Sequence, residues 1–411
     1  MAKVRVWQIA GGIPDRDYTG LMMKYGVAIL GPGDPGEYTT EPGKRDKKYD
    51  FLRDPNKSRC EVVDRVRRFA QEVREGDLVL LRLGSEPRAV GVFTSAYKWR
   101  EEFSDILGWD LQHTRRVKWM RIEDIERKLP AVARKVKTAF QTKKQKRKTT
   151  FCGFYDLDDG TAKELLELVK REGTKGQDFK IGERITLDNM RDWLLGSKSA
   201  SDGSDDNEKR RAREWLSGRI SELVSVIAQN ELRYADWRRT EQMTEADTIA
   251  YSVRPLLKAL GWGNEQIVNE HGKVDVAVVP FPLEKEQKPW ILIEAKSFNS
   301  AIFGRGPLKQ LLEYLEDLRN RKGETPCILA ISCGTIWLVY DADTVERLLK
   351  QKKEAKEKDD VPPDGYINLA RLRQWSVDKD GNRFRYDAAQ TLYRLSPAYY
   401  LNKAQGDCGR R

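Results

Sequence analysis

Histidine is nearly absent from this chain of 411 residues, which contains only His113 and His271. Nucleases with histidine-bound metals, phosphodiesterases with a catalytic histidine and Ser-His-Asp hydrolases all need this side chain as a ligand or a general base. This scarcity argues against those classes. We expect any catalysis by this protein to depend on carboxylates and lysine.

Cysteine is also scarce. The five cysteines are an odd number and include no C-x-x-C pair, at Cys60, Cys152, Cys327, Cys333 and Cys408. Such a set forms neither a disulfide framework nor a zinc knuckle. We interpret all five as reduced thiols without a role in the chemistry.

Long hydrophobic runs are missing as well. No apolar stretch approaches the ~18 residues that a membrane span requires. The N-terminal sequence MAKVRVWQIAGG lacks the apolar core of a signal peptide. We therefore expect a soluble cytoplasmic protein with no membrane partner.

Charge, by contrast, is abundant: 34% of the residues are charged, and the net formal charge is +11. A positive excess favours a polyanionic partner. The densest basic run, RKVKTAFQTKKQKRK at residues 134–148, contains no acidic residue. It is either a solvated basic face or a DNA contact, and we favour the contact because each neutralised phosphate releases counterions. The expected contacts to the DNA backbone are Lys143, Lys144, Lys146, Arg147 and Lys148.

A group of acidic residues and one lysine accompanies two β-rich runs at residues 274–279 and 290–293. Asp275 opens the first run, and Glu294 and Lys296 close the second. Glu294 and Lys296 are two residues apart, so on a strand they project from the same face. Pairing of the two runs would bring Asp275 beside them. Two carboxylates and a lysine suit metal-assisted phosphodiester hydrolysis, although Glu-x-Lys at a strand end is often only a solvated charge pair.

Helical patterns flank these two runs. TEADTIAYSVRPLLKALGW (residues 244–262) has apolar residues at helical spacing, with Thr244 as a possible N-cap and Glu245 in its first turn. PLKQLLEYLEDL (residues 307–318) is a second amphipathic helix and carries Gln310. The order helix-Glu, Asp, Glu-x-Lys, helix-Gln resembles the PD-(D/E)xK nuclease superfamily. Within residues 240–345 it looks most like the N-terminus of type I restriction endonuclease R subunits, with the matches LLKALGW, VDVAV, IEAK, QLLEYL and GTIWLVYD.

This resemblance implies a role for each matched residue. Asp275 and Glu294 would be metal ligands, Lys296 the catalytic lysine, Glu245 a further metal ligand, and Gln310 a residue that braces the site. The implied cofactor is Mg²⁺, and Mn²⁺ can substitute because both ions accept carboxylates. The charged insert at residues 283–288 departs from the family pattern and leaves the strand register open.

A second resemblance concerns the first part of the chain. EGDLVLLRLG…AVGVFTSAYKW (residues 75–99) and GWDLQHTRRVKW (residues 108–119) resemble the EVE domain of the PUA-like superfamily. The family implies a β-barrel that holds a flipped, modified base in an aromatic pocket. The candidate pocket residues are Trp7, Trp99, Trp109 and Asp110, and ordinary core packing is the alternative for each tryptophan.

Together these patterns predict an α+β multidomain protein. Residues 1–157 form an EVE/PUA-like β-barrel with helices, and residues 158–208 form a helical and acidic flexible linker. Residues 209–345 form an α/β PD-(D/E)xK restriction-endonuclease-like domain. Residues 346–411 form a charged helix and a C-terminal extension, which packs back on the nuclease or supports an oligomer.

The predicted function is that of a modification-dependent (type IV-like) restriction endonuclease. It would cut double-stranded DNA near a modified base, with cytosine the favoured one, held by the N-terminal domain. A single site cuts one strand, so we expect a homodimer at least during cleavage. The alternatives are an RNA-directed or single-strand nuclease, a nuclease on unmodified DNA whose barrel is a nucleic-acid-binding module, and a binding protein with an inactive nuclease fold.

Overall fold

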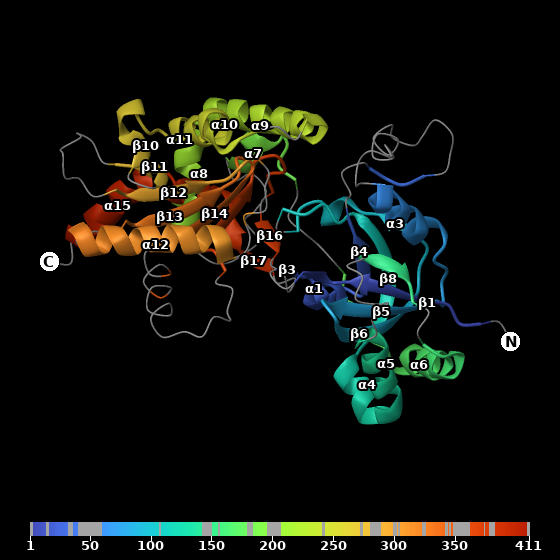
Figure 1. Cartoon of the computed structure of the whole chain (residues 1–411). Coiled ribbons are helices and arrows are strands. Elements are labelled where there is room, and N and C mark those ends of the chain that lie inside the picture. The colour runs from blue at the N-terminus through green and yellow to red at the C-terminus, as the bar shows by residue number, and fades with distance from the viewer. Residues whose placement is uncertain are drawn as a thin grey trace. The chain divides into compact units, whose positions relative to one another are not determined.

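The structure is a computed structural model of the chain (Figure 1). It describes residues 3–13, 16–31, 36–39, 60–106, 108–141, 150–154, 157–178, 184–194, 207–240, 243–271, 274–279, 289–298, 302, 305–322, 326–341, 344, 347, 362–373, 375–377 and 383–408. Contacts divide it into two compact units. The first contains Met1–Ile181 and Val377–Arg383, and the second contains Gly182–Ser376 and Phe384–Arg411. Each unit has its own main sheet and helices, so the predicted α+β multidomain class is confirmed at this level.

A curled seven-stranded sheet forms the centre of the first unit, in the order β4-β8-β6-β5-β1-β9, with β7 also paired to β8. Its strands are β1 (Val6–Ala10), β4 (Val27–Leu30), β5 (Leu78–Leu83), β6 (Glu86–Phe93), β7 (Lys98–Trp99), β8 (His113–Arg121) and β9 (Phe151–Gly153). Strands β1 and β5 are parallel and the other neighbours antiparallel. A small hairpin joins β2 (Gly12–Ile13) to β3 (Arg16–Asp17).

Helices cover both faces of this sheet. They are α1 (Thr19–Lys24), α3 (Cys60–Gln71), α4 (Ile122–Lys128), α5 (Pro130–Gln141) and α6 (Asp159–Glu172). Helices α4, α5 and α6 bury one apolar cluster with alternate residues of the strands, such as Leu78, Leu80, Val90 and Val92. This period of two is what a strand with one face on the core requires.

Two expectations for the first unit need correction. The closed barrel is only half formed, because in the described residues β4 and β9 each pair with a single neighbour and leave the sheet open. The unit also continues beyond residue 157, to Ile181. The reason is α6, whose buried residues Leu165, Leu168 and Val169 belong to the core of this unit rather than to a flexible linker.

The start of α6 gives a pH-dependent prediction. Asp158 accepts the backbone N–H of Thr161 at 2.8 Å and its hydroxyl at 2.7 Å, and these bonds, with Lys135, lower the pKa of Asp158 from 3.8 to about 2. A lowered pKa means that this contribution is fully present above about pH 4 and is lost as the pH falls towards 2. We expect Asp158→Ala to lower the melting temperature at pH 6, with a difference from the wild type that shrinks below pH 4. A difference that stays constant from pH 6 to pH 3 would contradict this account.

The second unit has a six-stranded sheet in the order β10-β11-β12-β13-β14-β15. The strands are β10 (Ile267–His271), β11 (Val274–Val278), β12 (Ile291–Ala295), β13 (Ile328–Ser332), β14 (Ile336–Asp341) and β15 (Gly365–Asn368). Strands β12 and β13 are parallel, and all other neighbours are antiparallel. β13 and β12 are buried along their whole length, as their unbroken apolar sequences indicate.

Helices lie on both faces of this second sheet (Figure 1). They are α7 (Met190–Leu194), α8 (Asn207–Ser217), α9 (Ile220–Thr240), α10 (Glu245–Thr248), α11 (Arg254–Ala259), α12 (Arg305–Lys322), α14 (Ala388–Arg394) and α15 (Pro397–Cys408). Helices α8 and α9 are separated around Gly218, a poor helix former. Helix α12 packs on β12 and β13, whereas α8, α9, α11 and α14 share the core on the other face.

The C-terminal extension belongs to this second unit, apart from Val377–Arg383. Strand β15 pairs with β14, and Leu392, Tyr393 and Leu395 of the last helices are buried in the same core. Tyr400 stacks on Trp290 with ring centroids 5.0 Å apart. Of the two alternatives for residues 346–411, the structure shows the described part of this extension packed back on the preceding part of the second unit. A short hairpin, β16 (Trp375–Val377) and β17 (Arg383–Asp387), precedes α14.

No helix in the part of the chain that the structure describes is long and apolar enough to cross a membrane.

Candidate active site

Two paired strands place the first carboxylates. Strands β11 and β12 are antiparallel with Val276 opposite Ile293, so the next step of the register sets Asp275 opposite Glu294. Residues opposite one another in an antiparallel pair project from the same face. The Asp275 carboxylate accepts the backbone N–H of Ala295, with 2.7 Å between Oδ2 and N. Glu294 is buried, with only 6% of the residue exposed.

Lys296 follows directly after β12. Its Nζ lies 2.6 Å from Oε1 of Glu294, and its backbone N–H donates to the carbonyl of Ser332 at 2.8 Å. That backbone bond continues the pairing of β12 with β13 and fixes the start of the lysine side chain. The side chain is 21% exposed and can be reached by a substrate from solvent.

A helix start brings in a third acid. Thr244 and Asp247 form a capping box in which each side chain binds the backbone N–H of the other residue, and this fixes the first turn of α10. Glu245 is the first residue of that turn, and its Oε1 lies 3.7 Å from Nζ of Lys296. Three separate segments of the chain thus bring three carboxylates to one lysine.

The electrostatics of the group are those of a crowded anionic site. Burial raises the pKa of Glu294; the hydrogen bond from Lys296 lowers it, and the charges of Asp275 and Glu245 raise it further. Burial lowers the pKa of Lys296, but the hydrogen bond to Glu294 and the neighbouring acids outweigh it, so this pKa is raised overall. Lys296 is therefore a cation, and it neutralises only part of the surrounding negative charge.

These residues fit a divalent cation held by two carboxylates. Within the described residues, no three His, Cys, Asp or Glu side chains are grouped so that they could hold an ion together. Glu245 lies against Lys296 as an ion-pair partner, and its role as a third metal ligand stays a prediction. Mg²⁺ needs only one or two carboxylates and keeps several waters. Asp275 and Glu294 meet that need, and their mutual repulsion is what a cation between them would relieve.

The fifth predicted residue is apart from the other four. Gln310 lies in the second turn of α12 with an exposed side chain. Among the described residues, no hydrogen bond joins it to Glu245, Asp275, Glu294 or Lys296. The structure gives it no bracing contact to this site.

A buried polar pair supports the site from behind and was missed in the sequence. The Ser252 hydroxyl donates to Oδ1 of Asn230 at 2.9 Å, and both residues are 0% exposed. Ser252 lies in a π-helical turn (Ile249–Val253) directly after α10, and such turns are frequent at functional sites. A Cβ on Gly334, which has a φ of +84°, would stand 3.1 Å from this hydroxyl. The pair therefore links α9 and the Glu245 helix to the turn after Ser332, to which Lys296 is bonded.

The candidate base-pocket residues do not form one group. Trp7 is 7% exposed, stacks on Phe151 with ring centroids 5.2 Å apart, and donates its Nε1–H to Asp77 at 2.8 Å. It is a core residue on β1, whereas Trp99 lies on β7 at the other side of the sheet. This corrects the prediction for Trp7.

The other three candidates lie near the start of β8. Trp99 pairs with His113 and is half-buried, Trp109 is 40% exposed, and Asp110 is half-buried. The basic residues Lys143, Lys144, Lys146, Arg147 and Lys148 lie outside the described residues, so their predicted contacts to DNA stay a prediction.

Comparisons with known proteins bear on the first unit only. Residues 7–144 match the model of a family described as a domain of unknown function (DUF8426). This stretch begins at β1 and ends just after α5. No curated protein matched the chain. The matching family carries no activity, so the chemistry has to be argued from the side chains themselves.

Proposed function

We propose that the second unit is a metal-dependent nuclease that hydrolyses phosphodiester bonds in DNA. The observation that carries this proposal is the convergence of Asp275, Glu294 and Lys296 at one end of two paired strands, with Glu245 beside them. Burying a carboxylate such as Glu294 is costly unless it has a charge partner, and one lysine does not balance the charges of Glu294, the half-buried Asp275 and the exposed Glu245. A bound divalent cation would neutralise the remaining negative charge and could in turn bind a phosphate group of the substrate.

Each residue has a definite task in this proposal. Asp275 and Glu294 hold the cation. When bound, Mg²⁺ supplies a Lewis acid for the phosphoryl oxygen and lowers the pKa of a water. Lys296 holds positive charge beside Glu294 and stabilises the negative charge that develops on the phosphate. Glu245 keeps the ammonium group in place from the opposite side, and the Asn230–Ser252 pair positions the helix that carries Glu245.

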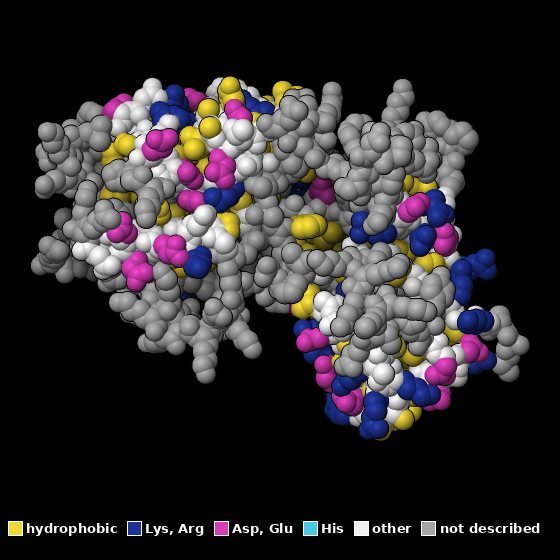
Figure 2. Space-filling model, in the orientation of Figure 1, with side chains coloured by type: hydrophobic (Ala, Val, Ile, Leu, Met, Phe, Trp, Pro, Cys, Tyr) yellow, Lys and Arg dark blue, Asp and Glu magenta, His cyan; other side chains and the backbone are white. Residues whose placement is uncertain are grey.

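A nucleic acid target is supported by the distribution of charge. Residues 1–181 contain 38 Lys and Arg residues and 28 Asp and Glu residues, so they carry +10 of the formal charge of +11. Figure 2 shows dark blue Lys and Arg side chains mixed with magenta Asp and Glu side chains over the part of the first unit that α4, α5 and α6 occupy, so the positive excess is not concentrated on these helices. A positive surface binds a polyanion without reading its sequence. The first unit is thus the part that we expect to hold the DNA.

The dependence on a modified base rests on the first unit as a reader. Its curled sheet with helices on both sides is compatible with the EVE/PUA-like resemblance of residues 75–119. Flipping a base costs a few kcal/mol and is worthwhile only where a pocket discriminates between bases. We therefore propose a modification-dependent, type IV-like restriction endonuclease whose two copies together cut both strands.

The deciding experiment is a cleavage assay with Mg²⁺ on four matched duplexes. One is unmodified, and the others carry 5-methylcytosine, 5-hydroxymethylcytosine or glucosylated cytosine. We expect cleavage of a modified duplex only, and none with Asp275→Ala or with EDTA. Asp192→Ala, which removes an exposed acid of the same unit, is the matched control and should cut normally.

Each other outcome removes a definite part of the proposal. Equal cleavage of all four duplexes would remove the modification reader and keep the nuclease. If Asp275→Ala cut as fast as the wild type, the active-site assignment would be wrong. Absence of cleavage on every duplex, with cleavage of RNA, would change the substrate.

A further inference from the structure

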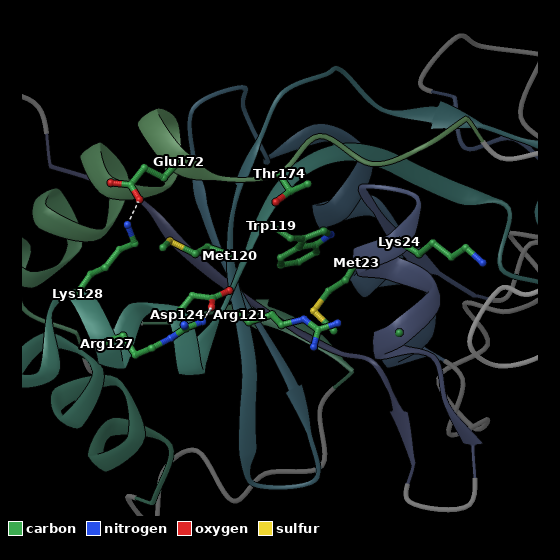
Figure 3. A pocket seen from close by; sticks show the side chains of 11 residues that line it. Met23, Lys24, Trp119, Met120, Arg121, Asp124, Arg127, Lys128, Glu172 and Thr174 are labelled. Carbon is green, nitrogen blue, oxygen red and sulfur yellow. Dashed lines mark hydrogen bonds and ion pairs between the residues drawn. The ribbon is translucent and has the colours of Figure 1, made fainter.

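The first unit contains a cavity of about 810 Å³ that none of the predicted pocket residues lines (Figure 3). It lies between α1, the end of β8, the start of α4 and the segment that follows α6. Its floor is formed by Trp119, Met120 and Met23. Thr174 borders it, and its side chain is exposed.

The frame of this cavity is fixed by backbone contacts. Trp119 and Thr174 bind each other through both backbone groups, at 3.2 and 2.9 Å, and the indole N–H donates to the carbonyl of Val27 at 3.2 Å. A Cβ on Gly91 would stand 2.5 Å from the Trp119 ring, so only glycine leaves room for it. The cavity therefore has a defined shape before any ligand binds.

The border of the cavity is polar on several sides. Asp124 pairs with Arg127, and Lys128 pairs with Glu172. Arg121 is exposed and its guanidinium lies beside Met23 in Figure 3. Planar carboxylates and guanidinium groups offer several acceptors and donors at fixed angles. A ligand with many hydroxyl groups can use such a border, whereas a methyl group gains only from apolar contacts.

The size of the cavity points the same way. Pockets of about 300–1,000 Å³ serve drug-sized ligands and enclose most of their surface. A methylated base is much smaller than such a ligand and would leave most of this volume to water. A base that carries a hexose is itself of drug-like size and would fill more of the cavity than a methylated base, with water taking up the rest. The apolar floor would contact the base or one face of the sugar, and the charged border would bind the hydroxyl groups.

We propose that this cavity binds the sugar of a glycosylated base in DNA, so that the modification recognised by the first unit is a hexosyl group and not a methyl group. This inference rests on the proposed function, since it names the class of modification that the reader would select.

Binding can be measured separately from cutting. In the Asp275→Ala background, the affinities of the four matched duplexes are determined by fluorescence anisotropy. We expect the glucosylated duplex to bind at least about tenfold more tightly than the 5-methylcytosine duplex, a difference of about 1.4 kcal/mol. Thr174→Trp fills the cavity while keeping the backbone bonds of Thr174, and should abolish this preference. Lys175→Trp, at the neighbouring exposed position outside the cavity, should keep it.

A second pair of variants tests the proposal independently, in case Thr174→Trp does not fold. Arg121→Ala removes an exposed cation at the border and should weaken the glucosylated duplex several-fold more than the unmodified one. Arg134→Ala removes an exposed cation of α5 and should weaken all duplexes alike. A preference for 5-methylcytosine, or a preference for the glucosylated duplex that survives Thr174→Trp, would contradict the proposal that the cavity binds the sugar. Recognition of a modified base by the first unit would still stand. Equal affinities for all four duplexes would remove the modification reader itself, and the cavity proposal with it.

Discussion

Replacing Lys296 by alanine is expected to lower the rate of DNA cleavage by about 10²–10³-fold, the usual cost of losing one group that stabilises transition-state charge. Nζ of Lys296 is the one cation among Glu245, Asp275 and Glu294 in the described site, at 2.6 Å from Glu294 and 3.7 Å from Glu245. In the proposed function, the net positive charge of the first unit would supply most of the affinity for DNA. Binding should therefore stay within a few-fold of the wild type.

The measurement is single-turnover cleavage, together with the dissociation constant in EDTA. Lys258→Ala removes an exposed lysine of α11 in the same unit and is the matched control. Lys296→Arg keeps a positive charge but replaces a compact ammonium with a planar fork, so it should restore little of the rate. If Lys296→Ala weakened binding and cleavage by the same factor, Lys296 would be a phosphate contact and not a group that acts in the chemical step.

The convergence of the four charged residues could be predicted from the sequence because it follows from short-range rules. Glu294 and Lys296 are two apart on a strand, and Asp275 opens a run that pairs with it. Thr244 is a capping residue, so the helix start that carries Glu245 could be recognised too. No such rule covered Gln310, whose position depends on how α12 lies across the sheet.

The support behind the site could not be predicted for the same reason. A serine and an asparagine in two different helices give no sign that they are partners, and a π-helical turn has no reliable sequence signal. Their contact depends on the packing of α9 against the π-helical turn and α11. The one sequence signal is the polar side chain of Ser252, which lies next to the buried Val253 and four residues before Leu256. A polar residue on the apolar face of a helix needs a hydrogen-bond partner.

The first unit shows where residue type misleads. Tryptophan is suited both to a base pocket and to a core, and the choice for Trp7 is made by partners far away in sequence, Asp77 and Phe151. Trp119 was one of several aromatics in its stretch, yet it lines a cavity of the first unit because Thr174 pairs with it from beyond α6. Helix α6, which was predicted to lie in a linker, packs in the core of the first unit. Its local composition gives no sign of this packing.

Arg115 gives the largest effect on stability that we expect. It is 4% exposed, and its guanidinium donates to the carbonyls of Phe69 at 2.8 Å, Ala70 at 2.9 Å and Ser95 at 3.1 Å. Two of these carbonyls belong to the last turn of α3, where the backbone has no partner of its own. Burial lowers the pKa of Arg115 to about 10, and the charges of Asp77 and Glu75 offset part of that shift. One side chain thus ties the helix to β8.

Arg115→Ala should destabilise the first unit by about 3–5 kcal/mol, because it leaves three carbonyls without their charged donor in a site that water reaches poorly. Arg115→Lys keeps the charge but cannot span carbonyls of two segments, and should recover less than half of the loss. Urea unfolding of the full chain, followed by tryptophan fluorescence, measures the effect on the transition of this unit. Arg134→Ala, at an exposed position of α5, should stay within about 0.5 kcal/mol of the wild type. If Arg115→Lys were as stable as the wild type, the positive charge alone would hold α3, and the three directed hydrogen bonds would not be its cause.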